Sequence, residues 1–293
     1  MRVLKKLLTG LLLLSMAVTG STADHGSVSR TLAVEPLHQI ANPVAAEVSL
    51  QIPATDVADV DGQQPWIGII IDDLGYQQSD RRVVLLPGPI ACAFLPHTPY
   101  AVELAELAIQ QHKEVMLHQP MESTTGKKLG PGALTLAMDE TSFRHTLNHN
   151  LASLPNVSGV NNHMGSLLTS HYQPMSWLMS ELRRHNSLFF IDSRTTEQTV
   201  ALHTATDNQL PSSLRDVFLD NQPEAALVRA QFELLVKKAR SQGTAIAIGH
   251  PYAETIAMLE AELPKLGARG ISLRPVKEII KRRQQQLVTA WHQ

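Results

Sequence analysis

The sequence predicts an α/β fold in which seven or eight parallel strands form a distorted, TIM-like (β/α) barrel. From residue 65 onward, short apolar segments alternate with helical patterns, and parallel neighbours need such crossover helices. Polar residues follow most of the apolar segments, at the ends that share one face in a barrel. An open doubly wound sheet is the alternative. Because neither a Gly-x-Gly-x-x-Gly nor a Walker A pattern follows the first strand, the usual nucleotide-binding versions are excluded.

The first strand, expected at residues 66–72, is the clearest element. Five of its first six residues are apolar and three are consecutive isoleucines, which is typical of a strand buried on both faces. Asp72 and Asp73 follow, with Gly75 close behind. Since adjacent unpaired acids are costly to bury, we expect the strand to end there, beside a cleft. A turn with helix-capping aspartates would have the same sequence.

The later elements follow the same alternation of apolar strands and amphipathic helices. The loops at residues 119–136 and 195–213 are long enough to shape a cleft. Further strands are expected at residues 90–95, 114–117, 158–160, 188–191, 217–219, 244–248 and 270–273, and helices at 79–84, 101–111, 139–154, 174–185, 224–241, 253–263 and 276–283.

The N-terminus has the pattern of an export signal. Arg2, Lys5 and Lys6 precede an apolar segment at residues 7–18, which is short for a membrane span, and small residues at 21–23 fit a cleavage site. An uncleaved anchor is the alternative. The predicted organisation is a signal peptide at 1–23, a linker at 24–64 rich in Pro, Ser, Thr and Asp, a folded domain at 65–284 and a C-terminal tail at 285–293.

Composition limits the function classes. The chain has 293 residues, of which 43% are hydrophobic and 18% charged, so a packed core is expected. A net charge of -2 gives no electrostatic basis for binding nucleic acid, and after signal cleavage no integral membrane span is expected. Cys92 is the single cysteine, so no intramolecular disulfide can form.

Histidines and aspartates gather at the predicted carboxyl ends of strands. Each has an ordinary alternative as a loop or ion-pair residue, as Asp192 has with Arg194. In a barrel, however, these ends share one face, where catalysis takes place. We therefore interpret the set as one candidate site: Asp72, Asp73, His97, His118, His163, Asp192 and His250.

These residue types favour metal-assisted hydrolysis of an amide or ester. An aspartate and two histidines suit zinc or another divalent ion with a position open for water, a second carboxylate can take the proton of that water, and a further histidine can protonate the leaving group. Covalent catalysis is disfavoured because Gly-x-Ser-x-Gly is absent and Cys92 falls inside a predicted strand. A glycoside hydrolase using Asp72 or Asp73 with Asp192 stays open, and would need carboxyl groups about 5 to 10 Å apart.

Five short motifs together resemble the divergent polysaccharide deacetylase family of bacterial, often periplasmic, proteins. The resemblance covers roughly residues 66–280. The motifs are Ile-Asp-Asp-Leu-Gly at 71–75, Leu-His-Gln-Pro-Met-Glu at 117–122, Gly-Val-Asn-Asn-His-Met-Gly-Ser at 159–166, Phe-Ile-Asp-Ser at 190–193 and Ala-Ile-Gly-His-Pro at 247–251.

That family is related to the NodB-like carbohydrate esterases, which fold as distorted βα barrels. The resemblance implies that Asp72 is the catalytic base, Asp73 a metal ligand and His250 the general acid. His118 matches the first histidine of the esterase His-Ser/Thr-x-x-His motif, but Glu122 stands where the second is expected. Either His163 or Glu122 would then complete the metal shell. The catalytic arginine motif of those esterases is not recognisable in this sequence.

From the residues and the resemblance together, we expect a periplasmic deacetylase-like hydrolase that binds a divalent metal, Zn²⁺ first, through Asp73, His118 and His163. Its substrate would be an acetylated carbohydrate such as peptidoglycan. Glu122, Asn162, Asp192 and His97 are expected to contact substrate or support the ligands. The alternative is a non-catalytic glycan-binding or envelope-regulatory protein that retains the barrel.

Overall fold

The computed structural model describes residues 64–185 and 187–291. The predicted signal peptide, and the predicted linker as far as residue 63, lie outside the described residues. Within them, no helix combines the length and the apolar character that a membrane crossing requires.

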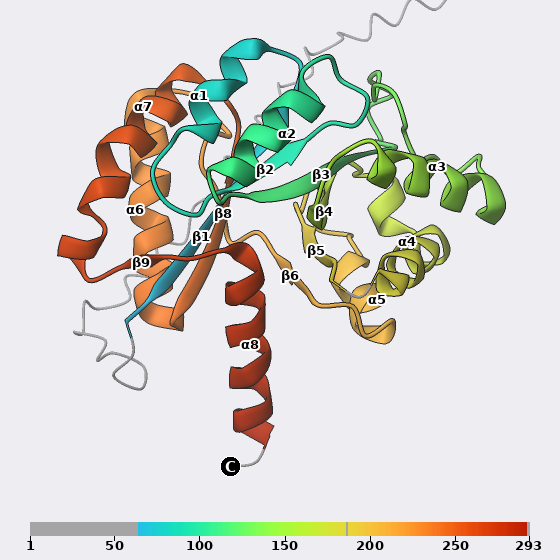
Figure 1. Ribbon diagram of the computed structural model, residues 1–293. Coiled ribbons are helices and arrows are strands. Elements are labelled where there is room, and N and C mark those ends of the chain that lie inside the picture. Colours follow the sequence, from blue (N-terminus) through green and yellow to red (C-terminus); the bar gives the residue numbers. More distant parts are fainter. Residues whose placement is uncertain (1–63, 186, 292–293) are drawn as a thin grey trace, which may run out of the picture. The chain divides into compact units, whose positions relative to one another are not determined.

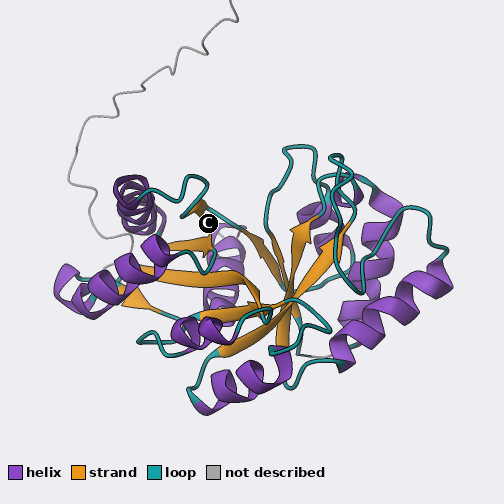
Figure 2. Ribbon diagram, turned by 90° about the horizontal axis from the view of Figure 1, so that it is seen from above, coloured by secondary structure: helices purple, strands orange, loops and turns teal. Residues whose placement is uncertain are grey.

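A single curled sheet of parallel strands forms the centre of the fold, with helices around it (Figures 1 and 2). Eight strands follow the order β6-β5-β4-β3-β2-β1-β8-β7, and β9 pairs with β1. The strands are β1 Trp66–Leu74, β2 Ala91–Phe94, β3 Glu114–Met121, β4 Val157–Met164, β5 Phe189–Asp192, β6 Ser212–Leu214, β7 Val217–Phe218, β8 Thr244–Gly249 and β9 Ser272–Leu273.

One extended segment joins the two edges of the sheet. β6 pairs with β5 and β7 with β8, and only Arg215 and Asp216 separate these two short strands. The backbone N–H of Arg215 donates to Asp192 at 3.0 Å, whereas that of Asp216 donates to Ile246 of β8 at 2.8 Å. The chain therefore changes partner between these two residues and closes the ring without a β6–β7 ladder. The predicted distorted barrel of parallel strands is confirmed.

Helices follow the strands as the alternation predicts. In Figure 2 most of them lie around the outside of the sheet. Asp139 caps the third helix as its sequence suggests, because its Oδ1 accepts the N–H of Ser142 at 2.7 Å. The last helix runs well beyond the predicted residue 283. The helices are α1 Arg81–Val84, α2 Ala101–Gln110, α3 Glu140–Ala152, α4 Tyr172–Arg184, α5 Ala201–Asp207, α6 Ala225–Gln242, α7 Ala253–Glu262 and α8 Val276–Trp291.

The core has two layers, which explains the run of isoleucines in β1. Ile69 and Ile71 belong to the layer between the sheet and the outer helices, whereas Ile70 points into the barrel. The barrel interior also contains Val276 and Ile279 of α8, so this helix closes the end of the barrel at which the strands begin. The opposite end, where the strands finish, remains free for polar side chains.

Several strands extend further than their apolar segments predict. β1 includes both aspartates, β3 continues past His118 to Met121 and β4 past His163 to Met164, so the predicted ends of these strands were wrong. The ladder continues because polar residues face each other across it, as His118 does with Asn161. β6 and α5 lie in a region expected to be loop, because their short, polar sequences lack a clear periodicity.

Candidate active site

A local irregularity sends the two adjacent aspartates in different directions. The pairing of β1 with β2 shifts register between Ile71 and Leu74, and Asp73 has a φ of 61°. Asp72 is buried at 2% exposure, whereas Asp73 is half-buried. Gly75 then turns the chain at a φ of 110°, where a Cβ would lie 2.3 Å from Oγ1 of Thr98. The Asp-Asp-Leu-Gly sequence thus provides one inward and one rim carboxylate.

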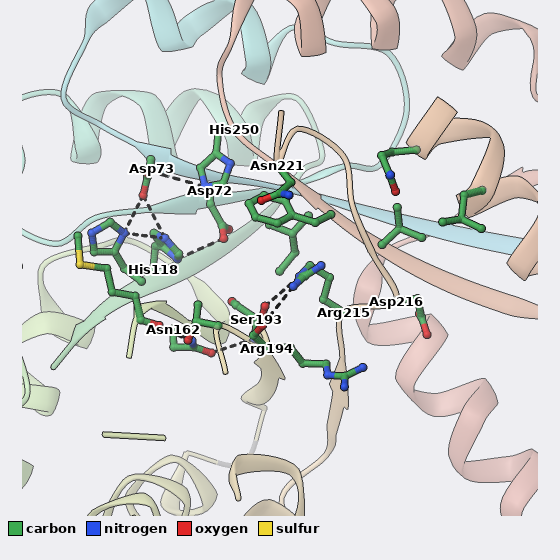
Figure 3. A pocket seen from close by; sticks show the side chains of 18 residues that line it. Asp72, Asp73, His118, Asn162, Ser193, Arg194, Arg215, Asp216, Asn221 and His250 are labelled. Carbon is green, nitrogen blue, oxygen red and sulfur yellow. Dashed lines mark hydrogen bonds and ion pairs between the residues drawn. The ribbon is translucent and has the colours of Figure 1, made fainter. Parts of the chain in front are cut away.

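Asp73, His118 and His163 converge on one point at the mouth of the barrel. Oδ1 of Asp73 lies 3.1 Å from Nε2 of His118 and 2.9 Å from Nδ1 of His163, and the two ring nitrogens are 3.2 Å apart. Of the described residues, these three form the group of potential ligand atoms that could hold a metal ion. The structure thus brings His163 together with Asp73 and His118. Figure 3 shows Asp73 and His118 facing each other.

The chemistry of these three atoms fits a divalent cation. Ligand atoms around tetrahedral Zn²⁺ are about 3.3 Å apart, close to the separations seen here. Oδ1 of Asp73 is buried and has no hydrogen-bond partner among the described residues, although two ring nitrogens lie beside it. While both ring nitrogens lack a proton, a buried carboxylate oxygen in this position is costly, and a cation would remove that cost.

Asn161 fixes the orientation of His118 by a side-chain hydrogen bond. Its Oδ1 lies 2.9 Å from Nδ1 of His118, and its Nδ2 donates to Oδ1 of Asp72 at 2.8 Å. Because Oδ1 can only accept, Nδ1 of His118 carries a proton in either charge state, and in the neutral ring Nε2 presents its lone pair toward Asp73. One amide therefore fixes the tautomer of the histidine and the position of the inner aspartate.

The site strongly favours positive charge. Burial alone would lower the pKa of His118, but the carboxylates of Asp72 and Asp73 outweigh it and raise that pKa to about 9. Burial also opposes ionisation of Asp73, yet its interactions with His118 and His163 hold the pKa of Asp73 well below its usual range. A cation at this point would take the place of the proton.

Asp72 has a different electrostatic environment. Burial raises the pKa of this carboxyl group, and the nearby His118, His250 and Asn161 offset the rise only in part. The pKa values of the two neighbouring aspartates therefore shift in opposite directions. The shift favours the ionised form of Asp73 and the protonated form of Asp72. Such a division is typical of a metal ligand beside a general base.

Asp220 fixes His250 on the other side of the mouth. Oδ1 of Asp220 lies 2.9 Å from Nδ1 of His250, while its Oδ2 accepts the backbone N–H of His250 at 2.6 Å and the hydroxyl of Thr255 at 2.7 Å. Nε2 of His250 faces Asp73 at 3.9 Å. Burial lowers the pKa of His250, but Asp220 and the other carboxylates outweigh it and raise the pKa overall.

A pocket of ≈ 730 Å³ opens over these groups (Figure 3). Asp72, Asp73, His118, His163 and His250 all line it. Its remaining walls come from the ends of β4 and β5, the β6–β7 segment and α6. These walls include Asn162, Met164, Ser193, Arg194, Thr195, Arg215, Asp216, Val217, Phe218, Asn221, Gln231, Leu234 and Ile248.

Asn162 lies in the pocket, as expected, and connects two strand ends, because its Oδ1 accepts the N–H of Ser193 at 2.9 Å. Asp192 does not line the pocket. Its oxygens accept from the N–H of Arg194 and the hydroxyl of Thr199, so the geometry offers no support for a glycosidase that uses Asp192. Glu122 is also outside the group of potential metal ligands. Its carboxylate instead accepts the N–H of Leu136 and fixes the loop that follows β3.

His97 points away from the site. Its Nε2 lies 2.9 Å from Oδ1 of Asn150, and its ring stacks on His149. It follows the short strand β2 and does not line the pocket. Position at a strand end was therefore not sufficient for membership of the site.

Sequence reasoning missed Asn161, Asp220 and Arg215. Asn161 had a usable signal, because it stands beside Asn162 and His163 at a strand end. Asp220 follows a weak apolar segment, and only the pairing of β7 with β8 brings it to His250. Arg215 lies in a segment without recognisable periodicity, and its place depends on the change of strand partner.

Comparison with known proteins gives relatives along most of the described chain. An uncharacterized protein of Haemophilus influenzae is 37% identical over 204 residues, covering 69% of this chain and 72% of that protein. The Escherichia coli protein YibQ, also uncharacterized, is 35% identical over 195 residues, covering 66% of this chain and 61% of its own length.

A solved structure has the same fold. The uncharacterized protein ATU2773 of Agrobacterium tumefaciens superposes with a TM-score of 0.71 at 23% identity, covering 74% of this chain and 89% of that one. The model of one family, described as divergent polysaccharide deacetylase, matches residues 69–280. The match includes every residue that forms the pocket, and the chain belongs to the divergent polysaccharide deacetylase family.

Proposed function

We propose that this protein is an exported, periplasmic hydrolase that removes acetyl groups from a carbohydrate of the cell envelope with the help of a divalent metal. The observation that carries the proposal is the convergence of Asp73, His118 and His163, with a buried carboxylate oxygen that has no hydrogen-bond partner among the described residues. Membership of a polysaccharide deacetylase family supports the reaction type. The basic and apolar N-terminal segment supports export.

The three converging side chains would hold the ion, and Zn²⁺ suits two imidazoles and one carboxylate. When bound, such an ion supplies Lewis-acid polarisation of the acetyl carbonyl and makes a water molecule easier to deprotonate. Asn161 contributes by keeping the Nε2 lone pair of His118 directed at the site.

The protons would be moved by the two groups on either side of Asp73. Asp72 takes a proton from the attacking water, a role that its burial and raised pKa favour. His250, whose protonated form Asp220 stabilises, gives a proton to the departing amine or hydroxyl oxygen of the sugar. One water is consumed, and the products are acetate and the free sugar amine or hydroxyl.

Acetate release tests the proposal. Zinc-loaded wild-type protein and an Asp72→Asn variant would be incubated with peptidoglycan, chitooligosaccharides and O-acetylated glycans. The proposal expects release by the wild type and a loss of about 10²–10⁴-fold in the variant, the range that a general base contributes. His97→Ala is the matched control, because this histidine lies at a strand end but points away from the pocket.

A glycan-binding or envelope-regulatory protein with the same barrel gives a different result. Wild type and Asp72→Asn would then release equally little acetate from every glycan while both still bind one of them. That outcome would replace the hydrolase proposal with the binding one.

A further inference from the structure

Two arginines form a second polar region of the pocket, apart from the groups assigned to metal and proton transfer. Arg194 follows β5, and Arg215 lies between β6 and β7; both line the pocket. In Figure 3 they are drawn on the other side of Asp72 from Asp73. In the proposed function they would face a part of the substrate beyond the acetyl group.

Arg215 is held firmly by neutral partners. Its Nε donates to the carbonyl of Ser193 at 2.8 Å and its Nη2 to that of Arg194 at 3.2 Å, while the guanidinium lies over the ring of Phe218 at 4.7 Å. In the part of the chain that the structure describes, its Nη1 has no hydrogen-bond partner. The side chain is thus oriented in advance, with donors left for a ligand.

Neither guanidinium has a carboxylate partner in an ion pair among the described residues. The acids nearby are engaged elsewhere: Asp216 pairs with Arg283 at 2.6 Å, Asp192 accepts from the N–H of Arg194 and from Thr199, and Asp72 accepts from Asn161. Burial and the charge of Arg194 lower the pKa of Arg215 by more than the carboxylates of Asp192, Asp72 and Asp216 raise it. An anion bound here would relieve both effects.

We propose that Arg194 and Arg215 form a subsite for a carboxylate, so that the acetylated glycan taken by this pocket is an acidic one. The guanidinium fork matches a carboxylate in geometry, and the pocket already fixes one fork in place. The inference rests on the proposed function for the position of the acetyl group. It adds a preference for a negatively charged group on the same sugar or its neighbour.

Calorimetric binding tests this preference without turnover. All proteins would be full-length, zinc-loaded and carry Asp72→Asn. The neutral probe is tetra-N-acetylchitotetraose. One acidic probe is an alternating N-acetylglucosamine–N-acetylmuramic acid tetrasaccharide, whose carboxylates are lactyl groups. The other is a hyaluronan tetrasaccharide, whose carboxylates are uronates. We expect at least one acidic probe to bind about tenfold or more tightly than the neutral one, and more so at low salt.

The arginine variants decide whether the two side chains cause the preference. Arg194→Gln and Arg215→Gln are each expected to reduce it about tenfold, and Arg215→Lys, which keeps the charge but loses the fork, by less. Arg183 is exposed on α4 outside the pocket. Arg183→Gln makes the same charge change and should leave the preference for acidic probes intact. Because Arg194 is exposed, its variant tests the subsite even if Arg215→Gln folds poorly.

Equal or undetectable binding of the three probes, or a preference that survives both glutamine variants, overturns the subsite. A protein that prefers an acidic probe but releases no acetate overturns the hydrolase and keeps the subsite. Acetate release at equal rates from neutral and acidic glycans, with equal binding, keeps the hydrolase and rejects the subsite.

Discussion

Asp220 holds His250 by two contacts at once: one carboxylate oxygen lies 2.9 Å from the ring Nδ1 and the other accepts the backbone N–H at 2.6 Å. The imidazole is therefore fixed in orientation, and its Nε2 is directed toward Asp73. The same carboxylate favours the protonated ring. In the proposed function, this arrangement suits His250 to the role of general acid.

Replacing Asp220 by Asn should weaken the acid. A general acid works only while protonated, so activity falls as pH rises through its pKa. Because Asp220 helps to raise the pKa of His250, Asp220→Asn should move the alkaline limb of the kcat profile to lower pH and reduce kcat by up to about 10²–10⁴-fold. A pH series of acetate release measures both. An unmoved alkaline limb in a folded, zinc-loaded variant would argue against this role for His250.

Replacing Asn161 by Ala should weaken metal binding although Asn161 is not a ligand. The substitution removes the partner that fixes the tautomer of His118, and such supporting groups are worth about 10- to 100-fold in affinity. Competition with a zinc chelator measures the change. Asn162→Ala serves as the neighbouring control, because its amide contacts Ser193 and Met164 rather than His118; equal losses in both variants would indicate general damage to the strand end.

Glu114 should make the stability of the fold depend on pH. Its carboxylate accepts the N–H groups of Val276 and Lys277 at the start of α8, and burial raises its pKa from 4.5 to about 7. Between these values the folded protein retains a proton that the unfolded chain releases. Stability should therefore fall as pH rises from 4.5 to 7, by at most about 3 kcal/mol from this group.

Chemical unfolding of wild type and Glu114→Gln at a series of pH values tests this assignment. The difference between the two free energies of unfolding should change across the window and be constant outside it. A constant difference from pH 4 to 8 would show that Glu114 does not titrate there.

His97→Ala should separate stability from function. The side chain bonds to Asn150 away from the pocket, so its loss should cost about 1 kcal/mol of stability. Zinc stoichiometry and acetate release should stay within about twofold of wild type. A large loss of either, in a protein that is still folded at the assay temperature, would return His97 to the site.

The sequence predicted most of the fold because β1, β2 and β8 are strongly apolar and separated by amphipathic helices. It also predicted that Asp73, His118 and His163 lie together, since each stands at the end of such a strand. The sequence could not predict the direction in which a side chain at a strand end points. His97 satisfied the same rule as His118, yet its ring lies against Asn150, away from the pocket.

Contacts between distant weak segments were also beyond sequence reasoning. Asp220 reaches His250 only because two residues of β7 pair with β8. Glu122 was a reasonable ligand from its spacing after His118, but its carboxylate is used by the N–H of Leu136. Arg215 lies where the chain stops pairing with β5 and begins to pair with β8. No local sequence pattern marks such a change of strand partner.

The stoichiometry and location of bound zinc test the central claim most directly. Elemental analysis of zinc-equilibrated wild type should give one ion per chain, and Asp73→Ala, His118→Ala and His163→Ala should each lose it while remaining folded. A wild-type protein with no stoichiometric ion after zinc addition, or an ion retained by all three variants, would contradict the proposed metal site.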